Sequence, residues 1–497
     1  MQRKWWTLSV VCVATFMLLL DITVVNTALP DIQEDLDASF TDLQWVIDAY
    51  TLTLAAFTLS AGSLADRLGR RRVFAWGLAI FTVASLGCAL APSADALNIA
   101  RAFQGVGGAV MFAVSLALIA QEFHGRELGT ATGIYGATIG GAVAIGPLVG
   151  GALTDGLGWE SIFYLNVPIG IAAVWLTLTR VRESRDPQAR GVDWVGTVTF
   201  SGSLLCLVLA LLRGNSEGWE STNIVLLLAG AAVLFAAFVV AQMRVREPML
   251  PLALFRIPSF TGVQLGAFAI AGSQFALFLY ITLYLQNVLG LSPLEAGLAY
   301  LPITLTSFFV APISGQLIAR VQPRFLIGGG LALAGLGLIL MSGVEEGDEW
   351  TTLLGGFLLG GVGIGLLNPP TAAVAVQVVE RAQSGMAAGI NNTFRQVGIA
   401  VGIAAYGALF LNRAESEIAE RLPGADAHGL SEAVSSGALP SGPEPVVAAA
   451  REGFFAGFNE ILLIGGGLAL AGAVAALLLV RPQDIREDAE PALAAAA

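Results

Sequence analysis

Four ionisable side chains lie inside long apolar stretches of the sequence, at Asp21, Asp48, Arg101 and Arg395. Placing a charge in a hydrocarbon-like segment costs several kcal/mol, so such residues generally bind protons, ions or substrates. Partial desolvation favours the uncharged form of a carboxyl group, which suits Asp21 to bind and release protons near neutral pH. The alternative is a structural role for Asp21, as a hydrogen-bond acceptor between helices.

Asp48 stands between two aromatic residues, in the segment QWVIDAYTL of residues 44–52. Together with Trp45 and Tyr50, its carboxylate offers a cationic aromatic substrate an opposite charge and a cation–π contact. The competing interpretation is a polar residue near the outer membrane interface, flanked by the aromatic side chains that gather there. The spacing is compatible with both roles.

Arg101 and Arg395 stay charged at any working pH, because a guanidinium group is not deprotonated in proteins. Arg101 lies five or six residues inside its apolar stretch, so its side chain either acts there or extends to the outer interface. Arg395 lies deeper, in the polar run NNTFRQ of residues 391–396. It either contacts substrate or hydrogen-bonds to backbone carbonyl groups.

The composition places these residues in a membrane protein. Of 497 residues, 56% are hydrophobic and only 12% are charged, about half the charge of a soluble domain. This excludes a soluble enzyme, a disordered protein and a coiled coil, and the 59 glycines suit closely packed membrane helices. A net charge of −12 makes a nucleic acid an unsuitable partner. The three cysteines and two histidines predict no disulfide, metal site or cofactor.

Fourteen apolar runs are long enough to span a bilayer, which predicts an all-α polytopic protein. Most of the 25 Lys and Arg residues fall in alternate connecting segments, which places both termini in the cytoplasm. The first run has no cleavage site and is expected to remain a membrane helix. The runs are 7–29, 43–64, 72–92, 96–121, 128–153, 160–181, 193–212, 222–243, 260–286, 294–318, 324–343, 351–378, 385–411 and 455–480.

Internal repeats divide the chain into two bundles of six helices. The glycine pattern of residues 129–134 recurs at 385–390, and that of residues 105–107 recurs at 361–363, both 256 residues later. We therefore predict three parts: 1–185, an inserted helix pair with linker at 186–255, and 256–497. The third part includes an outer loop at 412–454, which we expect to be flexible apart from a short amphipathic helix at 413–421. Such repeats place the substrate between the halves near mid-membrane, with alternating access.

The first inner hairpin reads GSLADRLGRRR, residues 62–72. Its glycines permit a close helix crossing and a tight turn, its aspartate caps a helix or pairs with arginine, and its arginines hold the inner face. The string resembles the signature loop of the major facilitator superfamily. That resemblance implies a gating role for Gly62, Asp66, Arg67, Gly69, Arg70 and Arg71.

Four other segments resemble the drug:proton antiporters of that superfamily, in the branch with fourteen helices. They are LDITVVNTALP at 20–30, Arg101 with Gln104 and Gly105, the antiporter motif Gly146, Pro147, Gly150 and Gly151, and WESIFYLNVPIG at 159–170. Glu160 and Ser161 depart from the last pattern. The resemblance implies that Asp21, Asp48 and Arg101 take part in proton coupling, with Arg101 acting on a nearby carboxylate.

The resemblance implies a proton-driven exporter of lipophilic drugs or amphiphilic metabolites, in a bacterial inner membrane. We expect it to act as a monomer, with the lipid bilayer, protons and a small lipophilic substrate as its partners. No ATP-binding loop is present, so the proton gradient is the expected energy source. An importing facilitator, or a lipid or solute transporter of the same superfamily, is the alternative; a membrane enzyme is disfavoured because no catalytic cluster is evident.

The tenth run contains no acid, unlike that of some dication exporters, which leaves room for neutral or anionic substrates. Candidate residues of an apolar substrate cavity are Asn26, Trp45, Tyr50, Gln104, Gln274, Phe275, Phe278, Asn391, Asn392 and Arg395.

Overall fold

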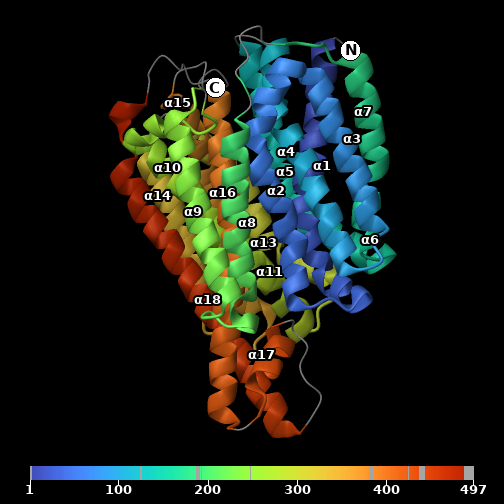
Figure 1. Cartoon of the computed structure of the whole chain (residues 1–497), viewed down its shortest axis with the longest axis vertical. Helices are drawn as coiled ribbons and strands as arrows, with labels where there is room; N and C mark the ends of the chain where they lie inside the picture. Colours follow the sequence, from blue (N-terminus) through green and yellow to red (C-terminus); the bar gives the residue numbers. More distant parts are fainter. Residues whose placement is uncertain are drawn as a thin grey trace.

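The computed structural model describes residues 3–123, 126–185, 191, 193–246, 248–318, 320–379, 384–423, 425–435 and 443–485. Within these residues all regular structure is helical, as predicted (Figure 1). The first helix begins and the last long helix ends at the same end of the molecule, drawn at the top in Figure 1.

The N-terminal half comprises seven helices that pack on one another. They are α1 (Arg3–Leu36), α2 (Phe40–Leu68), α3 (Arg70–Ala89), α4 (Ala94–Glu122), α5 (Arg126–Leu157), α6 (Glu160–Tyr164) and α7 (Asn166–Arg180). Helix α2 begins at a capping box, in which the Ser39 hydroxyl accepts from the Asp42 backbone N–H and the Asp42 carboxylate accepts from that of Ser39.

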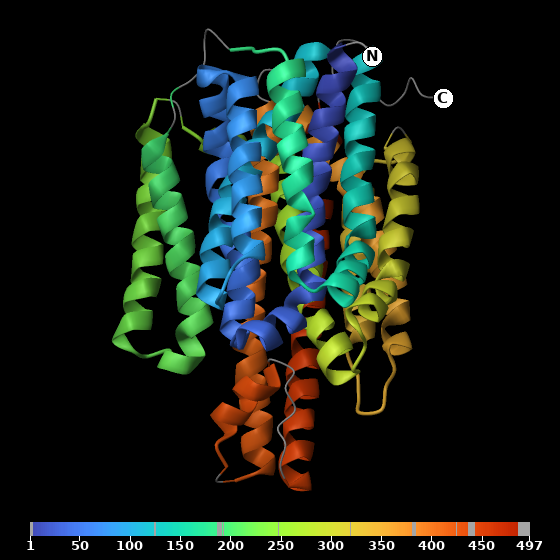
Figure 2. The ribbon, with the colours of Figure 1, turned by 90° about the vertical axis from the view of Figure 1, so that its right-hand side faces the viewer.

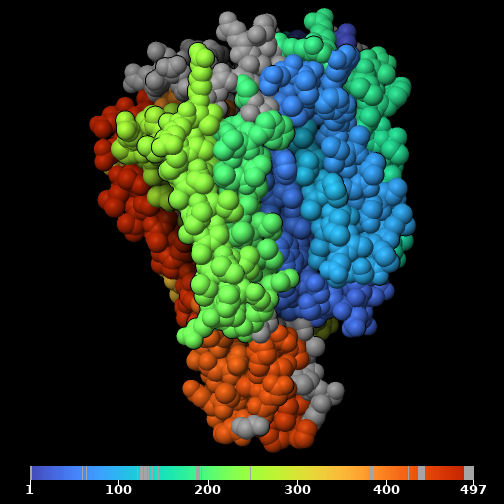
Figure 3. All heavy atoms as spheres, viewed as in Figure 1, coloured from blue at the N-terminus to red at the C-terminus, as the bar shows by residue number. Residues whose placement is uncertain are grey.

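The inserted pair consists of α8 (Trp194–Glu217) and α9 (Thr222–Arg244). Figure 2 shows the pair in green at one side of the molecule, and Figure 3 shows α8 and α9 covering the junction between the halves. Helix α8 reaches both halves, because Thr197 hydrogen-bonds with Ser60 of α2 and Asn215 donates to the Ala408 carbonyl. The pair therefore bridges the two halves.

The C-terminal half runs from η1 (Leu252–Arg256) to η6 (Pro482–Asp484). Between them lie α10 (Pro258–Ile270), η2 (Ala271–Phe275), α11 (Ala276–Leu283), η3 (Tyr284–Val288), α12 (Pro293–Ala299), α13 (Leu301–Leu317), α14 (Pro323–Met341), η4 (Trp350–Leu353), α15 (Leu354–Gln377), α16 (Ser384–Arg421), α17 (Ala427–Ser435) and α18 (Glu444–Leu479). Elements η2 and η3 are π-helical turns, which are rare and are frequently found at functional sites.

Each predicted apolar run coincides with one helix or with consecutive helices. By length and composition, eleven helical segments among the described residues can cross a membrane, or twelve if α12 and α13, bent by 40°, form one span. The total of fourteen spans and the cytoplasmic location of the termini stay predictions.

The helix expected at 413–421 is confirmed, whereas the expectation of a flexible loop over the rest of 412–454 is wrong for the described residues there. Helix α16 continues to Arg421, α17 follows, and α18 begins at Glu444. Together the end of α16, α17 and the start of α18 form a helical projection at the bottom of Figure 1. We call this projection the outer extension. Its Ala- and Glu-rich sequence favours helix, and buried Ile418 and Val434 give it an apolar interior. In the sequence these few apolar residues are surrounded by polar ones, so they do not by themselves indicate a packed core.

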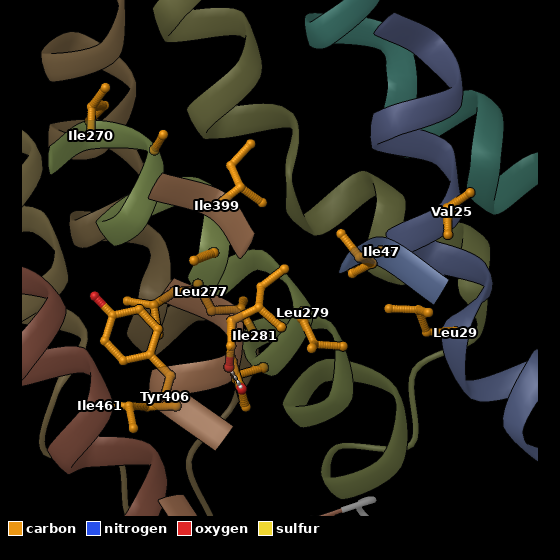
Figure 4. Close-up of a cluster of buried hydrophobic side chains, with 14 of the residues drawn as sticks. Val25, Leu29, Ile47, Ile270, Leu277, Leu279, Ile281, Ile399, Tyr406 and Ile461 are labelled. Atoms are coloured by element: carbon orange, nitrogen blue, oxygen red, sulfur yellow. Dashed lines mark hydrogen bonds between the residues drawn. The ribbon is translucent and has the colours of Figure 1, made fainter. Parts of the chain in front are cut away.

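The two halves meet near the end that carries the outer extension. Gln44 of α2 donates to the Tyr280 hydroxyl at 3.0 Å, and Gln286 donates to the Thr27 carbonyl at 2.8 Å. One apolar cluster contains residues of both halves, and Figure 4 shows Val25, Ile47 and Leu279 within it. The described structure therefore holds the halves together at this end.

Candidate functional site

Asp21 and Arg101 form an ion pair inside the N-terminal half. Arg101 Nη1 of α4 donates to Asp21 Oδ2 of α1 at 2.6 Å, and the two side chains are 1% and 0% exposed. Arg101 Nε also donates to the Val46 carbonyl of α2 at 2.9 Å, so one side chain links three helices. The structure brings together the acid and base that the resemblance implied.

Amide side chains complete the surroundings of this pair. Gln104 Nε2 donates to Asp21 Oδ1 at 2.8 Å, and Asn166 Nδ2 donates to the same oxygen at 2.9 Å. Gln104 also accepts from Arg101 Nη1 at 2.7 Å and donates to Ser85 at 2.8 Å. A buried ion pair persists when its remaining donors and acceptors are satisfied. Here both Asp21 oxygens have partners, as do Nε and Nη1 of Arg101. Sequence analysis missed Ser85 and Asn166; a polar residue within the apolar run 160–181 was the available signal for Asn166.

The aromatic residues near Asp48 do not face a common space. The ring of fully buried Tyr50 covers Arg101, whose Cζ lies 4.4 Å from its centroid. Trp45 is half-buried and packs in the cluster that joins α2 to α8. In this arrangement the cation–π partner of Tyr50 is therefore Arg101, and a role of Tyr50 and Trp45 toward substrate stays a prediction.

Asp48 is fully buried, and neither of its carboxyl oxygens has a hydrogen-bond partner among the described residues. It lies one helical turn after Gln44, on the side of α2 that meets the C-terminal half, where Gln44 also donates to the Ile403 carbonyl of α16. The two predicted proton-coupling acids thus differ sharply: Asp21 is paired and Asp48 is isolated.

The remaining candidate cavity residues are spread over both halves. Asn26 is half-buried and donates to the Ile22 carbonyl at 3.1 Å. Gln274 lies fully buried in η2, and neither polar atom of its amide has a partner among the described residues. The rings of half-buried Phe275 and Phe278 lie 5.6 Å apart.

On α16, Asn391 Nδ2 donates to Gln264 Oε1 at 3.0 Å, and Arg395 Nη2 donates to Asn368 Oδ1 at 2.9 Å. Helix α16 therefore contributes to a cluster of polar side chains inside the C-terminal half, whereas the Asp21–Arg101 pair lies in the N-terminal half. The described residues contain no cluster of three or more metal-binding side chains.

The predicted gating hairpin is held by a residue that sequence analysis missed. Glu183, just after α7, accepts from the Arg71 backbone N–H at 3.0 Å and lies 3.6 Å from Nε of both Arg71 and Arg72. Gly69 adopts a φ of +114°, which favours glycine, and Glu183 lies where its side chain would be. An acid just after the apolar run 160–181, in another predicted inner segment, was the available signal.

The other residues of the predicted gating hairpin are Gly62, Asp66, Arg67 and Arg70. The Arg70 backbone N–H donates to the Ser184 carbonyl at 2.9 Å, and Arg67 is exposed. No described atom lies within 4 Å of a Cβ built at Gly62, so the expected close helix crossing at Gly62 is wrong for this arrangement. The side chain of Asp66 lies outside the described residues.

The antiporter motif of α5 is a point of close helix contact. A methyl group at Gly146 would overlap the Thr23 side chain of α1, and one at Gly150 would overlap Thr27. Gly151 faces the Pro293 carbonyl of α12, in the other half. Reciprocally, a methyl group at Gly297 of α12 would overlap the Pro147 carbonyl. The motif therefore joins α5 to α1 and joins one half to the other.

Comparison with known proteins agrees with this architecture. Residues 11–403 match the family model described as Major Facilitator Superfamily. The tetracenomycin C resistance and export protein of Streptomyces glaucescens is 34% identical over 96% of this chain and 91% of its own length. The puromycin resistance protein pur8 of Streptomyces alboniger is 38% identical over 81% of each chain.

A third relative, the multidrug resistance protein Stp of Mycobacterium tuberculosis, is 38% identical over 79% of this chain and 73% of its own length. Among solved structures, an inward-facing bacterial homolog of the human lysosomal transporter Spinster matches with a TM-score of 0.64, 19% identity and coverage of 98% of this chain and 99% of that one. This likeness concerns the fold. The chain is a multi-pass membrane protein that belongs to the major facilitator superfamily, a family of transporters rather than enzymes.

Proposed function

We propose that this chain exports lipophilic compounds, drugs among them, across a bacterial plasma membrane in exchange for protons. Relatives named for resistance to tetracenomycin C, puromycin and multiple drugs support export. The contact that the antiporter motif makes with α12 supports alternating access, because it lies between the halves that must rock. In this proposal the transporter works as a monomer without a cofactor, and the proton gradient supplies the energy.

The observation that carries proton coupling is the isolated carboxyl group of Asp48. An unpaired carboxylate is strongly disfavoured in a dry interior, so Asp48 holds a proton while it is enclosed. When α2 and α16 separate, water reaches the carboxyl group and its proton can exchange. Proton binding at Asp48 is thereby linked to closure of the interface between the halves.

The Asp21–Arg101 pair supplies a second, internal switch. A proton on Asp21 removes the negative charge opposite Arg101, while Gln104 and the Val46 carbonyl still accept from the guanidinium. The electrostatic link from α1 to α4 then weakens, although α4 stays attached to α2. Protonation thus changes the contacts inside the half that moves.

The test is transport by the purified protein in liposomes, with puromycin as substrate and a pH gradient imposed across the membrane. We expect a gradient directed as in the cell to drive puromycin in the export direction, and an uncoupler to abolish the movement. Asp48→Asn should lose this gradient dependence, whereas Asp95→Asn, at an exposed acid on α4, should behave as wild type. Gradient-independent export would refute proton coupling, and accumulation in the import direction would favour the importing facilitator.

A further inference from the structure

Arg395 is a charge without a described counter-charge. Its Nη2 donates to the Asn368 side chain of α15, and no carboxylate of the described residues lies within ion-pairing distance. The side chain lies in the interior of the C-terminal half and is only half-buried, so part of it remains accessible. A guanidinium in such a place needs an anion or further acceptors.

Two amide donors without a described partner lie on α16 near Arg395 or contact that part of the helix. Asn392 is three residues earlier on α16, hence on the same side of the helix, and its Nδ2 has no described partner. Gln264 of α10 is fully buried; its Oε1 accepts from Asn391, which leaves its Nε2 without a described partner. Asn391 is four residues before Arg395, so it connects Gln264 to the same region of α16.

Unsatisfied buried donors are rare in native proteins and typically await a ligand, water or ion. Here Arg395 and Asn392 lie on one side of α16, and Gln264 contacts the same stretch of that helix through Asn391. All three side chains donate to oxygen. Gln396, four residues after Asn392 and therefore on the same side of α16 as Asn392, has an unpartnered Oε1 that suits a hydroxyl group of the same ligand. The rings of Phe255 and Phe394 lie 5.8 Å apart, and Phe394 precedes Arg395 on α16.

The charge balance of the interior favours the same ligand class. Asp21 and Arg101 neutralise each other. Asp48, which in the proposed function carries a proton while it is enclosed, contributes no charge in that state. Of the four intramembrane charges predicted from the sequence, Arg395 alone then remains uncompensated. A cationic substrate is repelled by this charge, whereas an organic anion neutralises it.

We propose that Arg395, Asn392 and Gln264 bind the anionic oxygen of an exported hydroxylated aromatic acid, a carboxylate or a phenolate. The proposal rests on the proposed export function and specifies its substrate class. Arg395 supplies charge and paired N–H donors, and the two amides direct N–H groups to the remaining oxygen lone pairs. The site discriminates by charge, because an uncharged analogue leaves the guanidinium without a counter-ion.

The test is equilibrium binding to the full-length protein in lipid nanodiscs, by calorimetry, with 1-hydroxy-2-naphthoate and its methyl ester. These probes share a ring system and differ in charge. We expect the wild type to bind the acid about 10- to 100-fold more tightly than the ester, the range expected for hydrogen bonds to a charged group. Arg395→Gln should remove that preference, and Asn392→Ala should reduce it. Arg256→Gln, at an exposed arginine before α10, is the matched control and should leave it unchanged.

Equal binding of acid and ester by the wild type, or a preference that survives Arg395→Gln, would overturn the proposal. Arg395→Lys keeps the charge but not the paired donors, so partial recovery is expected if the site holds an anion. If both arginine variants fail to fold, Asn392→Ala is the test: a reduced preference for the acid supports the proposal, and an unchanged preference contradicts it. Proton-driven export of puromycin with no acid preference would refute this inference alone. Arg395-dependent acid binding without any proton-driven transport would refute the proposed function alone.

Discussion

Arg101 Nη1 lies 2.6 Å from Asp21 Oδ2, across 80 residues of sequence and fully enclosed by α1, α2, α4 and α7. The contact places a compensated charge pair in the interior of one half of a transporter. Removing either partner by substitution leaves a buried charge alone. Loss of only one of the two charges should therefore destabilise the folded protein.

Replacing Asp21 with Asn should destabilise the protein. The substitution leaves Arg101 without its counter-charge, and breaking a buried pair costs about 3–5 kcal/mol. Thermal unfolding of the purified protein in detergent should show a lower midpoint for Asp21→Asn, while Asp95→Asn unfolds like the wild type. The double variant Asp21→Asn with Arg101→Gln should recover much of the loss, because it removes both charges, but should not transport. A single variant as stable as the wild type would contradict the ion pair.

Asp48→Asn, unlike Asp21→Asn, should leave the stability of the protein almost unchanged. An amide has the shape of a protonated carboxyl group, and Asp48 has no described partner to lose, so the free energy of unfolding should change by less than about 1 kcal/mol. The same thermal unfolding measurement, run beside Asp21→Asn, checks this. A loss as large as that of Asp21→Asn would show that Asp48 is ionised and paired in the folded protein.

Gly151→Ala should open the contact between the halves. The added methyl group meets the Pro293 carbonyl of α12, which is backbone and cannot rotate away. We expect several-fold slower transport in the liposome assay and a longer distance between spin labels at Glu34 of α1 and Leu298 of α12. Gly156→Ala, on the same helix, adds its methyl group where no described atom lies within 4 Å, so it should change neither quantity. Equal effects of the two variants would exclude the close contact as the cause.

Glu183→Gln should loosen the predicted gating hairpin without unfolding the protein. Arg71, Arg72 and Glu183 are all partly exposed, so the loss of stability should stay below about 1 kcal/mol. Hydrogen exchange of the backbone N–H groups at 69–73 should become faster, and transport in the liposome assay should fall. Glu127→Gln removes a different exposed ion pair, with Lys4, and should leave exchange at 69–73 unaltered. Unchanged exchange in Glu183→Gln would mean that the carboxylate does not hold the hairpin.

The sequence by itself was sufficient for the class of protein, the positions of the helices and the family. Low charge, apolar runs and the hairpin 62–72 are local features, and each can be recognised in a window of about one helix. The same locality explains the error at the outer extension. There, Ile418 and Val434 are too few to mark a core until α16, α17 and α18 are packed together.

Only the tertiary structure decided which polar residues meet. Asp21, Arg101 and Asn166 lie on three helices, and their contact depends on the rotation and crossing of each helix, which no local pattern specifies. The same is true of Glu183 at the hairpin. From the sequence, Asp21 and Asp48 were both intramembrane acids to which the resemblance gave a role in proton coupling. Packing gave one of them an arginine and enclosed the other without a described partner, because a helix presents only one side of its surface to each neighbour.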